Sequence, residues 1–382
     1  MKKRKKLIRG LMVLVIIGFA IGINLKIQKF SVKNNLTIVK WDNLYTDKNI
    51  NLYYGTSELP ILNELNSKYK VKEIVGGEKE KLNKALNIMK WTKANMKYDK
   101  NKKNKLENKG AADILGGKNK SKKYSNLEIC TVFNEFCNSE NIMCRLGKYT
   151  VLANEKLKKE SPDLFVCEIW DEKYNKWIMI DLINGVYVKE KETPLSAIEV
   201  IDKGIYNLNI VGAEKPKKYQ EKISKYFSNY TIKIDNTIYD VKKSNCYITY
   251  LGKDSDNKVS IKNPLEYPSI YTKDKHLFDV DPNKEKQSYN TDEKPTIIFS
   301  KVNTRKKSKK DKQDANVKME LCVGVFKNSS MEDKYYISIN DSPFEEKNKY
   351  FNVKIKEGIT NIKLSKDGKT VIREVEFQYN NK

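Results

Sequence analysis

Histidine is almost missing from this chain: its 382 residues include one, His276. That scarcity excludes metal sites built on several imidazoles, and it leaves any cysteine–histidine catalytic pair a single candidate base. The six cysteines include no CxxC pair, so the usual zinc-binding spacing is missing as well. We therefore expect neither a metal nor a cofactor.

Acidic residues are few relative to basic ones, 49 against 74, which gives a formal net charge of +25. A charge that large attracts polyanions, although a residue usage rich in lysine and asparagine is the plainer explanation of it. The basic runs at 100–109, 118–123 and 305–312 carry no interleaved aromatic residues, which argues against a groove that stacks bases. We expect no nucleic-acid partner; an anionic cell-envelope polymer or a protein fits better.

The N-terminus combines a basic flank with an apolar run. Residues 11–23 are apolar, and counting from Leu7 the run reaches about 17 residues, or about 26 Å of helix, just enough to span a bilayer. The positive charges all precede it, which orients the N-terminus to the cytoplasm. Residues 1–30 are thus expected to be a cytoplasmic tail and single-pass membrane anchor, with the rest of the chain extracytoplasmic. A cleaved signal peptide and a secreted protein are the competing interpretation.

Helix and strand signals are clearest between residues 78 and 204. The spacing of apolar residues predicts a helix over 78–98, and Ser125 with Glu128 forms a capping box that begins another, ending near 138–141. Runs at 164–170 and 176–181, separated by a polar turn, predict a hairpin. Thr193-Pro194 is expected to open a short helix that Gly204 closes.

The fold expected is α+β. We predict a first folded domain over 31–210, a β-rich extension over 211–293 and a separate C-terminal β sandwich over 294–382. The last region alternates in strand fashion, with turn signals at Gly358 and at Asp367-Gly368.

Residues 50–205 resemble the transglutaminase-like superfamily, and in particular its bacterial secreted or membrane-anchored members. The resemblance is carried by Thr-Val-Phe-Asn-Glu (131–135), Cys144-Arg145, Glu-Ile-Trp-Asp (168–171) and Lys-Trp-Ile-Met-Ile-Asp (176–181). It implies a helix packed on an antiparallel sheet, with papain-type cysteine catalysis. The C-terminal sandwich more weakly resembles an Ig-like module.

The resemblance also implies where a catalytic triad would stand. The family's cysteine begins the central helix and matches Asn126, its histidine begins the strand before Glu168 and matches Leu164, and its orienting acid matches Asp181. Only the aspartate is retained. We expect the hairpin to bring these three positions together.

With Asn126 and Leu164 at the positions of the family's cysteine and histidine, cysteine catalysis by this triad is not possible. An amide is not a nucleophile and a leucine is not a base, so Asp181 has no imidazole to orient. We therefore expect a pseudoenzyme with a binding or scaffolding role at the cell surface. The alternative is an active cysteine peptidase or transglutaminase with a relocated nucleophile, Cys130, one helical turn from Asn126, and His276 as base. The plainer role of Cys130 is to fill a core position, and His276 is expected at the surface.

Three further alternatives stay open. Glu168 and Asp181 could act as a carboxylate pair, although a structural role for Asp181 is favoured. Cys144 and Cys167 could form a disulfide in an oxidising compartment. The whole protein could also be a structural spacer in which the Ig-like module matters most.

Overall fold

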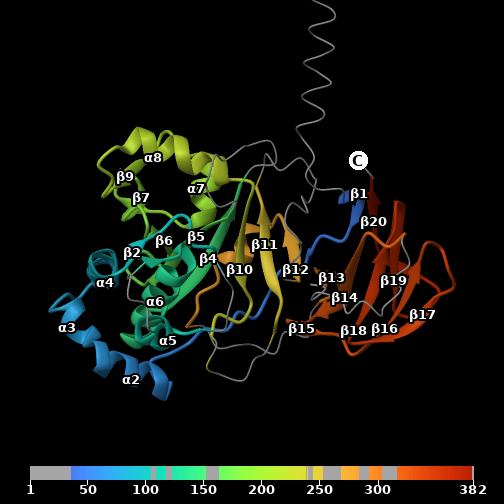
Figure 1. The fold of residues 1–382 in the computed structure, drawn as a ribbon, viewed down its shortest axis with the longest axis horizontal. Helices are drawn as coiled ribbons and strands as arrows, with labels where there is room; N and C mark the ends of the chain where they lie inside the picture. The colour runs from blue at the N-terminus through green and yellow to red at the C-terminus, as the bar shows by residue number, and fades with distance from the viewer. Residues whose placement is uncertain are drawn as a thin grey trace, which may run out of the picture.

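The computed structural model describes residues 36–104, 109–117, 123–151, 163–237, 239, 244–252, 268–283, 292–302 and 316–380. These residues form an α+β structure in which helices surround one large sheet and a second group of strands lies beside it (Figure 1). No helix within these ranges is long and apolar enough to cross a membrane. The predicted anchor at residues 1–30 lies outside the described residues.

The large sheet has nine strands among the described residues, in the order β12-β11-β10-β4-β5-β6-β7-β8, with β9 paired to β7. The strands are β4 (Cys144–Thr150), β5 (Asp163–Asp171), β6 (Lys176–Asp181), β7 (Val186–Glu190), β8 (Thr193–Pro194), β9 (Asn209–Val211), β10 (Asn229–Lys233), β11 (Tyr247–Leu251) and β12 (Ser269–Thr272). The predicted hairpin is confirmed, because β5 and β6 pair antiparallel with Trp170 opposite Trp177. Asn175 takes a positive φ of 51° in its turn.

The predicted β-rich extension over 211–293 is not separate from this sheet. Strand β10 pairs antiparallel with β4, and β11 and β12 follow it, so residues of this region complete the sheet that begins with β4. A pairing between strands so distant in the sequence leaves no local pattern from which it could be predicted.

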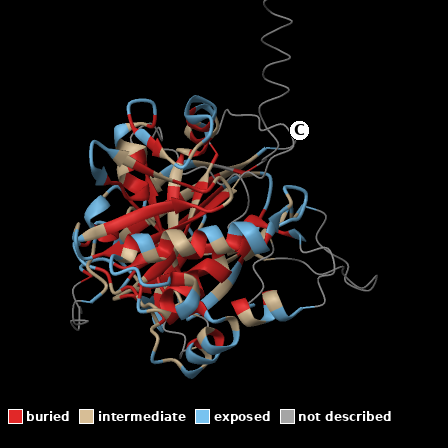
Figure 2. Ribbon diagram, turned by 90° about the vertical axis from the view of Figure 1, so that its left-hand side faces the viewer, coloured by how far each residue is buried: buried red, intermediate tan, exposed pale blue. Residues whose placement is uncertain are grey.

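Alternate residues of β5 enter two cores on opposite faces of the sheet. Phe165 and Cys167 belong to a helix-side core that also contains Phe133 of α6, whereas Leu164 and Val166 belong to a far-side core. The helix-side core is covered by α2 (Pro60–Tyr69), α3 (Val71–Val75), α4 (Lys81–Asn95), α5 (Ala111–Gly116) and α6 (Asn126–Ser139), and the far-side core by α7 (Ala197–Lys203), α8 (Pro216–Ile223), η1 (Ser224–Tyr226) and η2 (Lys275–Phe278). The strands are consequently buried on both faces, and exposed residues gather on the outer helices and loops (Figure 2).

Capping boxes begin α6 and α7, one on each side of the sheet. At α6 the Ser125 hydroxyl accepts a bond from the Glu128 backbone N–H (3.3 Å), and the Glu128 carboxylate accepts one from the Ser125 N–H (2.7 Å), as predicted. At α7 Ser196 and Glu199 make the same exchange. The predicted start of that helix at Pro194 is wrong, because Thr193–Pro194 forms β8 and the stronger cap follows it. Gly204 does end α7, as expected.

The second group of strands is a two-sheet sandwich around its own core. One sheet runs β1-β20-β19-β16-β17, and the other joins β13, β14 and β15 with β18 paired to β14. The strands are β1 (Leu36–Asp42), β13 (Thr296–Lys301), β14 (Met319–Lys327), β15 (Ser330–Met331), β16 (Lys334–Ile339), β17 (Glu345–Asn348), β18 (Tyr350–Ile355), β19 (Gly358–Ser365) and β20 (Val371–Tyr379). Strand β1 differs from expectation: it pairs with β20, so it belongs to the sandwich and not to the domain predicted over 31–210.

A short parallel pair, β2 (Lys97–Tyr98) and β3 (Lys123–Tyr124), completes the strands. It ties the end of α4 to the start of α6. Asp99 extends the tie, because its N–H donates to the carbonyl of Tyr124. Of the residues between these strands, Lys102, Lys103, Lys109 and Ile114 border the site described next.

Candidate functional site

Asn126 is the first residue of α6 and binds the backbone of β5 at two points. Its Nδ2 donates to the Phe165 carbonyl oxygen (3.0 Å), and its Oδ1 accepts from the Phe165 N–H (2.7 Å). The side chain is 4% exposed. Both ends of the amide are therefore engaged where the resemblance implies a nucleophile.

The sheet explains why Phe165 takes such a partner. Strand β6 pairs with β5 only from Cys167 onward, opposite Ile180, so β5 extends past the end of β6. A buried N–H and C=O at that point need other partners. The Asn126 amide supplies one donor and one acceptor, as a neighbouring strand would.

Cys130 lies one turn further along α6 and is fully buried. Its sulfur accepts a long bond from Asn126 Nδ2 (3.5 Å), and its carbonyl accepts one from the Cys167 thiol (3.4 Å). Burial raises the pKa of the Cys167 thiol well above its usual range. His276 is exposed on η2, whose Leu277 packs into the far-side core, so the sheet separates it from Cys130. The structure brings no base to this thiol among the described side chains.

The side chains of Leu164 and Asp181 also face the far side of the sheet. Leu164 packs in the far-side core, and Asp181 accepts bonds from Asn184 Nδ2 (2.7 Å) and Tyr219 Oη (3.2 Å). Burial raises the pKa of the Asp181 carboxyl. The Asn126 amide bonds to the backbone of Phe165, next to Leu164, while the Leu164 side chain turns to the opposite face of β5. That the three triad-equivalent side chains meet stays a prediction.

Glu168 serves a buried network and not a carboxylate pair. Its oxygens accept bonds from Arg145 Nε (2.7 Å), Tyr230 Oη (2.7 Å) and the Ala197 N–H (2.8 Å). The Arg145 guanidinium also lies 4.0 Å from the centre of the Trp177 ring. No group of three or more His, Cys, Asp or Glu side chains in the described part of the chain could hold a metal ion. All six cysteines, Cys144 and Cys167 included, are free thiols.

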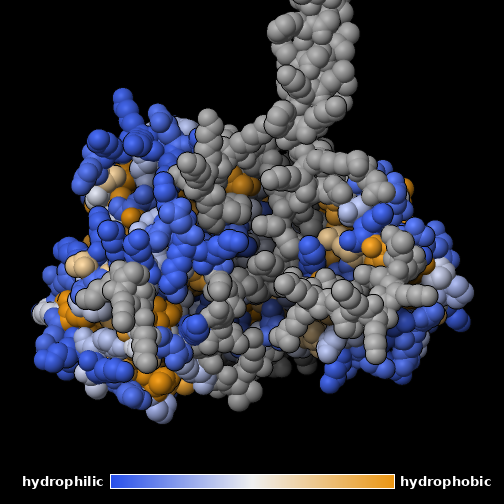
Figure 3. All heavy atoms as spheres, viewed as in Figure 1, coloured by the Kyte–Doolittle hydropathy of each residue, from blue (hydrophilic) through white to orange (hydrophobic). Residues whose placement is uncertain are grey.

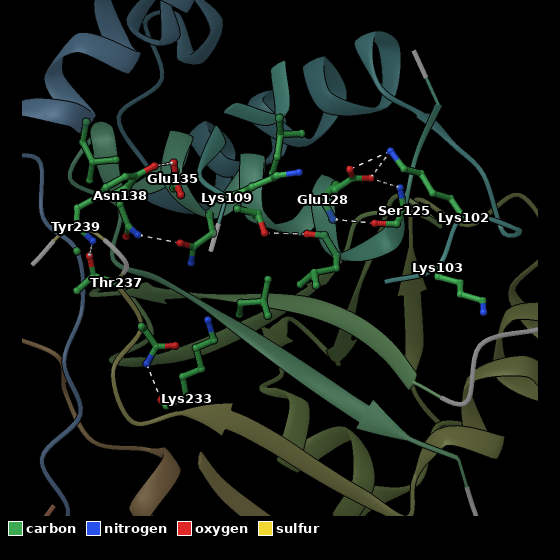
Figure 4. A pocket seen from close by; sticks show the side chains of 18 residues that line it. Lys102, Lys103, Lys109, Ser125, Glu128, Glu135, Asn138, Lys233, Thr237 and Tyr239 are labelled. Carbon is green, nitrogen blue, oxygen red and sulfur yellow. Dashed lines mark hydrogen bonds and ion pairs between the residues drawn. The ribbon is translucent and has the colours of Figure 1, made fainter. Parts of the chain in front are cut away.

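A cavity lies on the other face of α6. We call it the α6 pocket; it encloses about 500 Å³ between α6, α5, β4 and the end of β10 (Figure 4). Its lining residues are Gly55, Leu62, Lys102, Lys103, Lys109, Ile114, Ser125, Leu127, Glu128, Thr131, Asn134, Glu135, Asn138, Leu146, Lys233, Asn236, Thr237 and Tyr239. That volume falls within the range typical of small-molecule sites.

Four lysines and two glutamates line the α6 pocket. Lys102 is paired with Glu128 at 2.9 Å, while Lys103, Lys109 and Lys233 stand at other points of the wall. Figure 4 shows Lys233 rising from the strand floor toward α6. The described surface of the molecule, in the view of Figure 1, is largely hydrophilic with small apolar patches (Figure 3).

Glu135 closes one end of the pocket together with Tyr239. A single carboxylate oxygen accepts bonds from Tyr239 Oη (2.7 Å) and from the Ala111 N–H at the start of α5 (2.8 Å). Burial raises the pKa of the Glu135 carboxyl to about 7, against these two hydrogen bonds. Gly110 makes the contact feasible, because a Cβ added there would lie 1.6 Å from the Tyr239 hydroxyl oxygen.

Reasoning from the sequence missed this pocket, although α6 carried a signal of it. The helix carries a polar stripe at helical spacing, formed by Thr131, Asn134, Glu135 and Asn138, although nearly all of its residues are buried. A polar stripe of that kind ordinarily faces solvent. Here it faces a cavity walled by residues that come from far along the chain.

No protein-family model matches the chain, and no curated protein matches it either. The transglutaminase-like resemblance therefore rests on the motifs quoted from the sequence. The geometry of α6 and the α6 pocket has to carry the argument on function.

Proposed function

We propose that this protein is a catalytically inactive, transglutaminase-like binding protein of the cell surface. In this proposal residues 1–30 hold it in the membrane, the C-terminal sandwich is an Ig-like module, and the protein binds or scaffolds without acyl transfer. Its partner is an anionic polymer of the cell envelope or a protein. The α6 pocket is the site through which it binds.

One observation carries the proposal: the amide of Asn126 is used to complete the sheet. A nucleophile needs a free lone pair and a base within reach. The position that the resemblance assigns to the nucleophile holds a side chain bonded at both ends to Phe165. Such a residue stabilises the scaffold and performs no proton or acyl transfer.

The alternative of a relocated nucleophile has less support. Cys130 is fully buried, and its sulfur accepts a hydrogen bond from the Asn126 amide, which is no base. A reactive cysteine is partly exposed and lies beside a positive charge or a histidine. Cys130 meets neither condition, so packing is the role that fits it.

The test measures turnover and thiol reactivity on the full-length chain in detergent. We expect no ammonia release from glutamine peptides in the presence of a primary amine, and no cleavage of a peptide mixture. Alkylation by iodoacetamide, followed at each cysteine by mass spectrometry, should be slow at Cys130 in the folded protein. Cys322 provides the internal control, because it alone of the six cysteines is not fully buried and should react faster.

Either of two results would overturn the proposal. One is amine-dependent ammonia release that a Cys130→Ala substitution abolishes. The other is alkylation of Cys130 in the folded protein at a rate equal to or above that of Cys322.

A further inference from the structure

We propose that an exposed surface around α8 binds an anionic polysaccharide, meaning a linear chain of sugar units that carry carboxylate or phosphate groups. We call it the α8 surface; its residues are Tyr206, Lys215, Lys217, Lys218 and Lys225. The inference rests on the proposed function for the class of partner and adds a second place of contact. The α8 surface is separate from the α6 pocket, because α8 packs on the far-side core and α6 on the helix-side core.

The first observation is unbalanced charge. The segment 214–225 holds five lysines against two glutamates. The four lysines of the α8 surface are exposed, and none of them forms an ion pair with a carboxylate among the described residues. The fifth, Lys222, lies near the Asp181 carboxylate, where its charge acts against the effect of burial on the pKa of that group. Exposed cations without a counter-charge in the protein attract an anionic partner and can contact it directly.

The second observation is that these charges are spread along a helical segment. Lys218 and Lys225 are seven residues apart, or two turns, so they lie on the same side of the segment at a helical rise of about 10 Å. Lys215 and Lys217 extend the charge to the start of α8. A single small anion would reach one or two of these lysines. A chain with a charge on each unit can meet several at once, and the contacts then add.

The third observation is an aromatic ring beside the lysines. Tyr206 is 62% exposed, and its hydroxyl shares a hydrogen bond of 3.0 Å with that of Ser224, next to Lys225. Gln220 holds the segment that carries the ring, because its Nε2 donates to the Tyr206 carbonyl (3.3 Å) and to two neighbouring carbonyls. The exposed ring offers an apolar face on which the carbon-bound face of a sugar unit can pack. The ring and the charges together favour a polysaccharide.

An anionic lipid surface is the less suitable partner. The apolar side chains of α8, Tyr219 and Ile223, are buried in the far-side core, so the helix has no apolar side left to enter a bilayer. The described surface over α8 is largely hydrophilic in the view of Figure 3. A polysaccharide needs only charges and a ring to pack on, and the α8 surface has both.

The experiment follows the fluorescence anisotropy of labelled oligogalacturonate as the full-length chain in non-ionic detergent is added. Oligogalacturonate carries carboxylates on sugar rings. The unlabelled competitors are polyphosphate, which has charge but no ring, a neutral galactan, and mixed micelles of the same detergent with phosphatidylglycerol. We expect the oligogalacturonate to bind and polyphosphate to compete with it. The galactan and the lipid micelles should not compete.

Two triple variants with the same loss of charge locate the binding. The α8 variant replaces three lysines of the α8 surface: Lys217→Gln, Lys218→Gln and Lys225→Gln. The control variant does the same at three exposed lysines of the sandwich: Lys318→Gln, Lys354→Gln and Lys369→Gln. Only the α8 variant should bind oligogalacturonate more weakly, by about tenfold, the scale of three exposed ion pairs. Circular dichroism and the melting temperature would show that both variants are folded.

A single variant, Tyr206→Ala, tests the part played by the sugar ring. It should weaken binding of oligogalacturonate about threefold, since one exposed aromatic contact is lost. Its affinity for labelled polyphosphate should equal that of wild type, because polyphosphate has no ring to pack on Tyr206.

The proposal is overturned if oligogalacturonate does not bind at about 1 mM, the weak end of useful affinity. Equal weakening in the two triple variants would also overturn it, because it would mean general attraction to a basic chain. Displacement by the phosphatidylglycerol micelles would make the α8 surface a lipid-binding one, and equal loss of polyphosphate binding in Tyr206→Ala would contradict a polysaccharide. None of these outcomes concerns turnover or Cys130 alkylation, so the proposed absence of catalysis is tested separately.

Discussion

The two faces of α6 put similar polar residues to opposite uses. On the face toward the sheet, Asn126 bonds to β5 and is followed by Cys130, both inside the helix-side core. On the other face, Thr131 and Glu135 border a cavity. A polar side chain with all its bonds made inside the protein stabilises the fold, whereas one that faces a cavity can also meet a ligand. The face that resembles an active site in sequence is thus the less suited of the two to function.

Replacement of Asn126 by leucine should have the largest effect. It would remove both bonds to Phe165 and leave a buried N–H and C=O without partners, at about 1–3 kcal/mol each. We expect the free energy of unfolding to fall by about 4 kcal/mol in urea denaturation at constant m-value. The control is Asn83→Leu at an exposed position of α4, expected to change it by about 0.5 kcal/mol or less. Equal effects of the two variants would show that the Asn126 bonds contribute little.

Replacement of Glu135 by glutamine should change how the free energy of unfolding depends on pH. Because the folded-state pKa of Glu135 is raised from 4.5 to about 7, the folded protein binds this proton more tightly than the unfolded chain does. Stability from this group is therefore present below about pH 4.5 and is lost as pH rises through about 7, by about 3 kcal/mol in total. Glutamine has no such proton, so the variant should gain up to that amount relative to wild type between pH 5 and pH 8.

A second variant tests the cause of that shift. Tyr239 donates to the Glu135 carboxylate and favours its ionised form. Tyr239→Phe should therefore raise the pKa of Glu135 further and steepen the loss of stability with pH, whereas Glu135→Gln should flatten it. Melting temperatures across pH 5–8 would distinguish them. If wild type and both variants showed the same pH profile, Glu135 would not titrate in this range.

The local parts of this architecture were predictable from the sequence. The capping box at Ser125 marked the start of α6, and two strand-like runs separated by a polar turn marked the hairpin of β5 and β6. Helices α2 and α8 were missed, although Pro60 and Pro216 stand at their starts. In α8 only Tyr219, Gln220 and Ile223 are buried, which is too short an apolar pattern to stand out from a basic segment.

The candidate site was less predictable, for two physical reasons. Strand β5 is buried on both faces, so its residues show no polar–apolar alternation, and nothing local tells that Phe165 and not Leu164 faces α6. The α6 pocket depends on the pairing of β10 with β4, which carries Lys233 and Tyr239 to the side of α6. Long-range pairings of this kind are decided by the whole fold.

Ser125 caps α6 and also lines the α6 pocket. Its replacement by alanine, for which we expect the smallest change in stability, can tell these two roles apart. Ser125→Ala should lower the free energy of unfolding by about 1 kcal/mol, through loss of the bond from the Glu128 N–H. Ser196→Ala removes the equivalent cap of α7, on the other side of the sheet, and should have a similar effect in the same urea titration. Only Ser125→Ala should also weaken ligand binding in the α6 pocket, because of the two hydroxyls only that of Ser125 borders the cavity. If both variants weakened binding alike, the loss would reflect stability alone, and Ser125 would have no part in recognition.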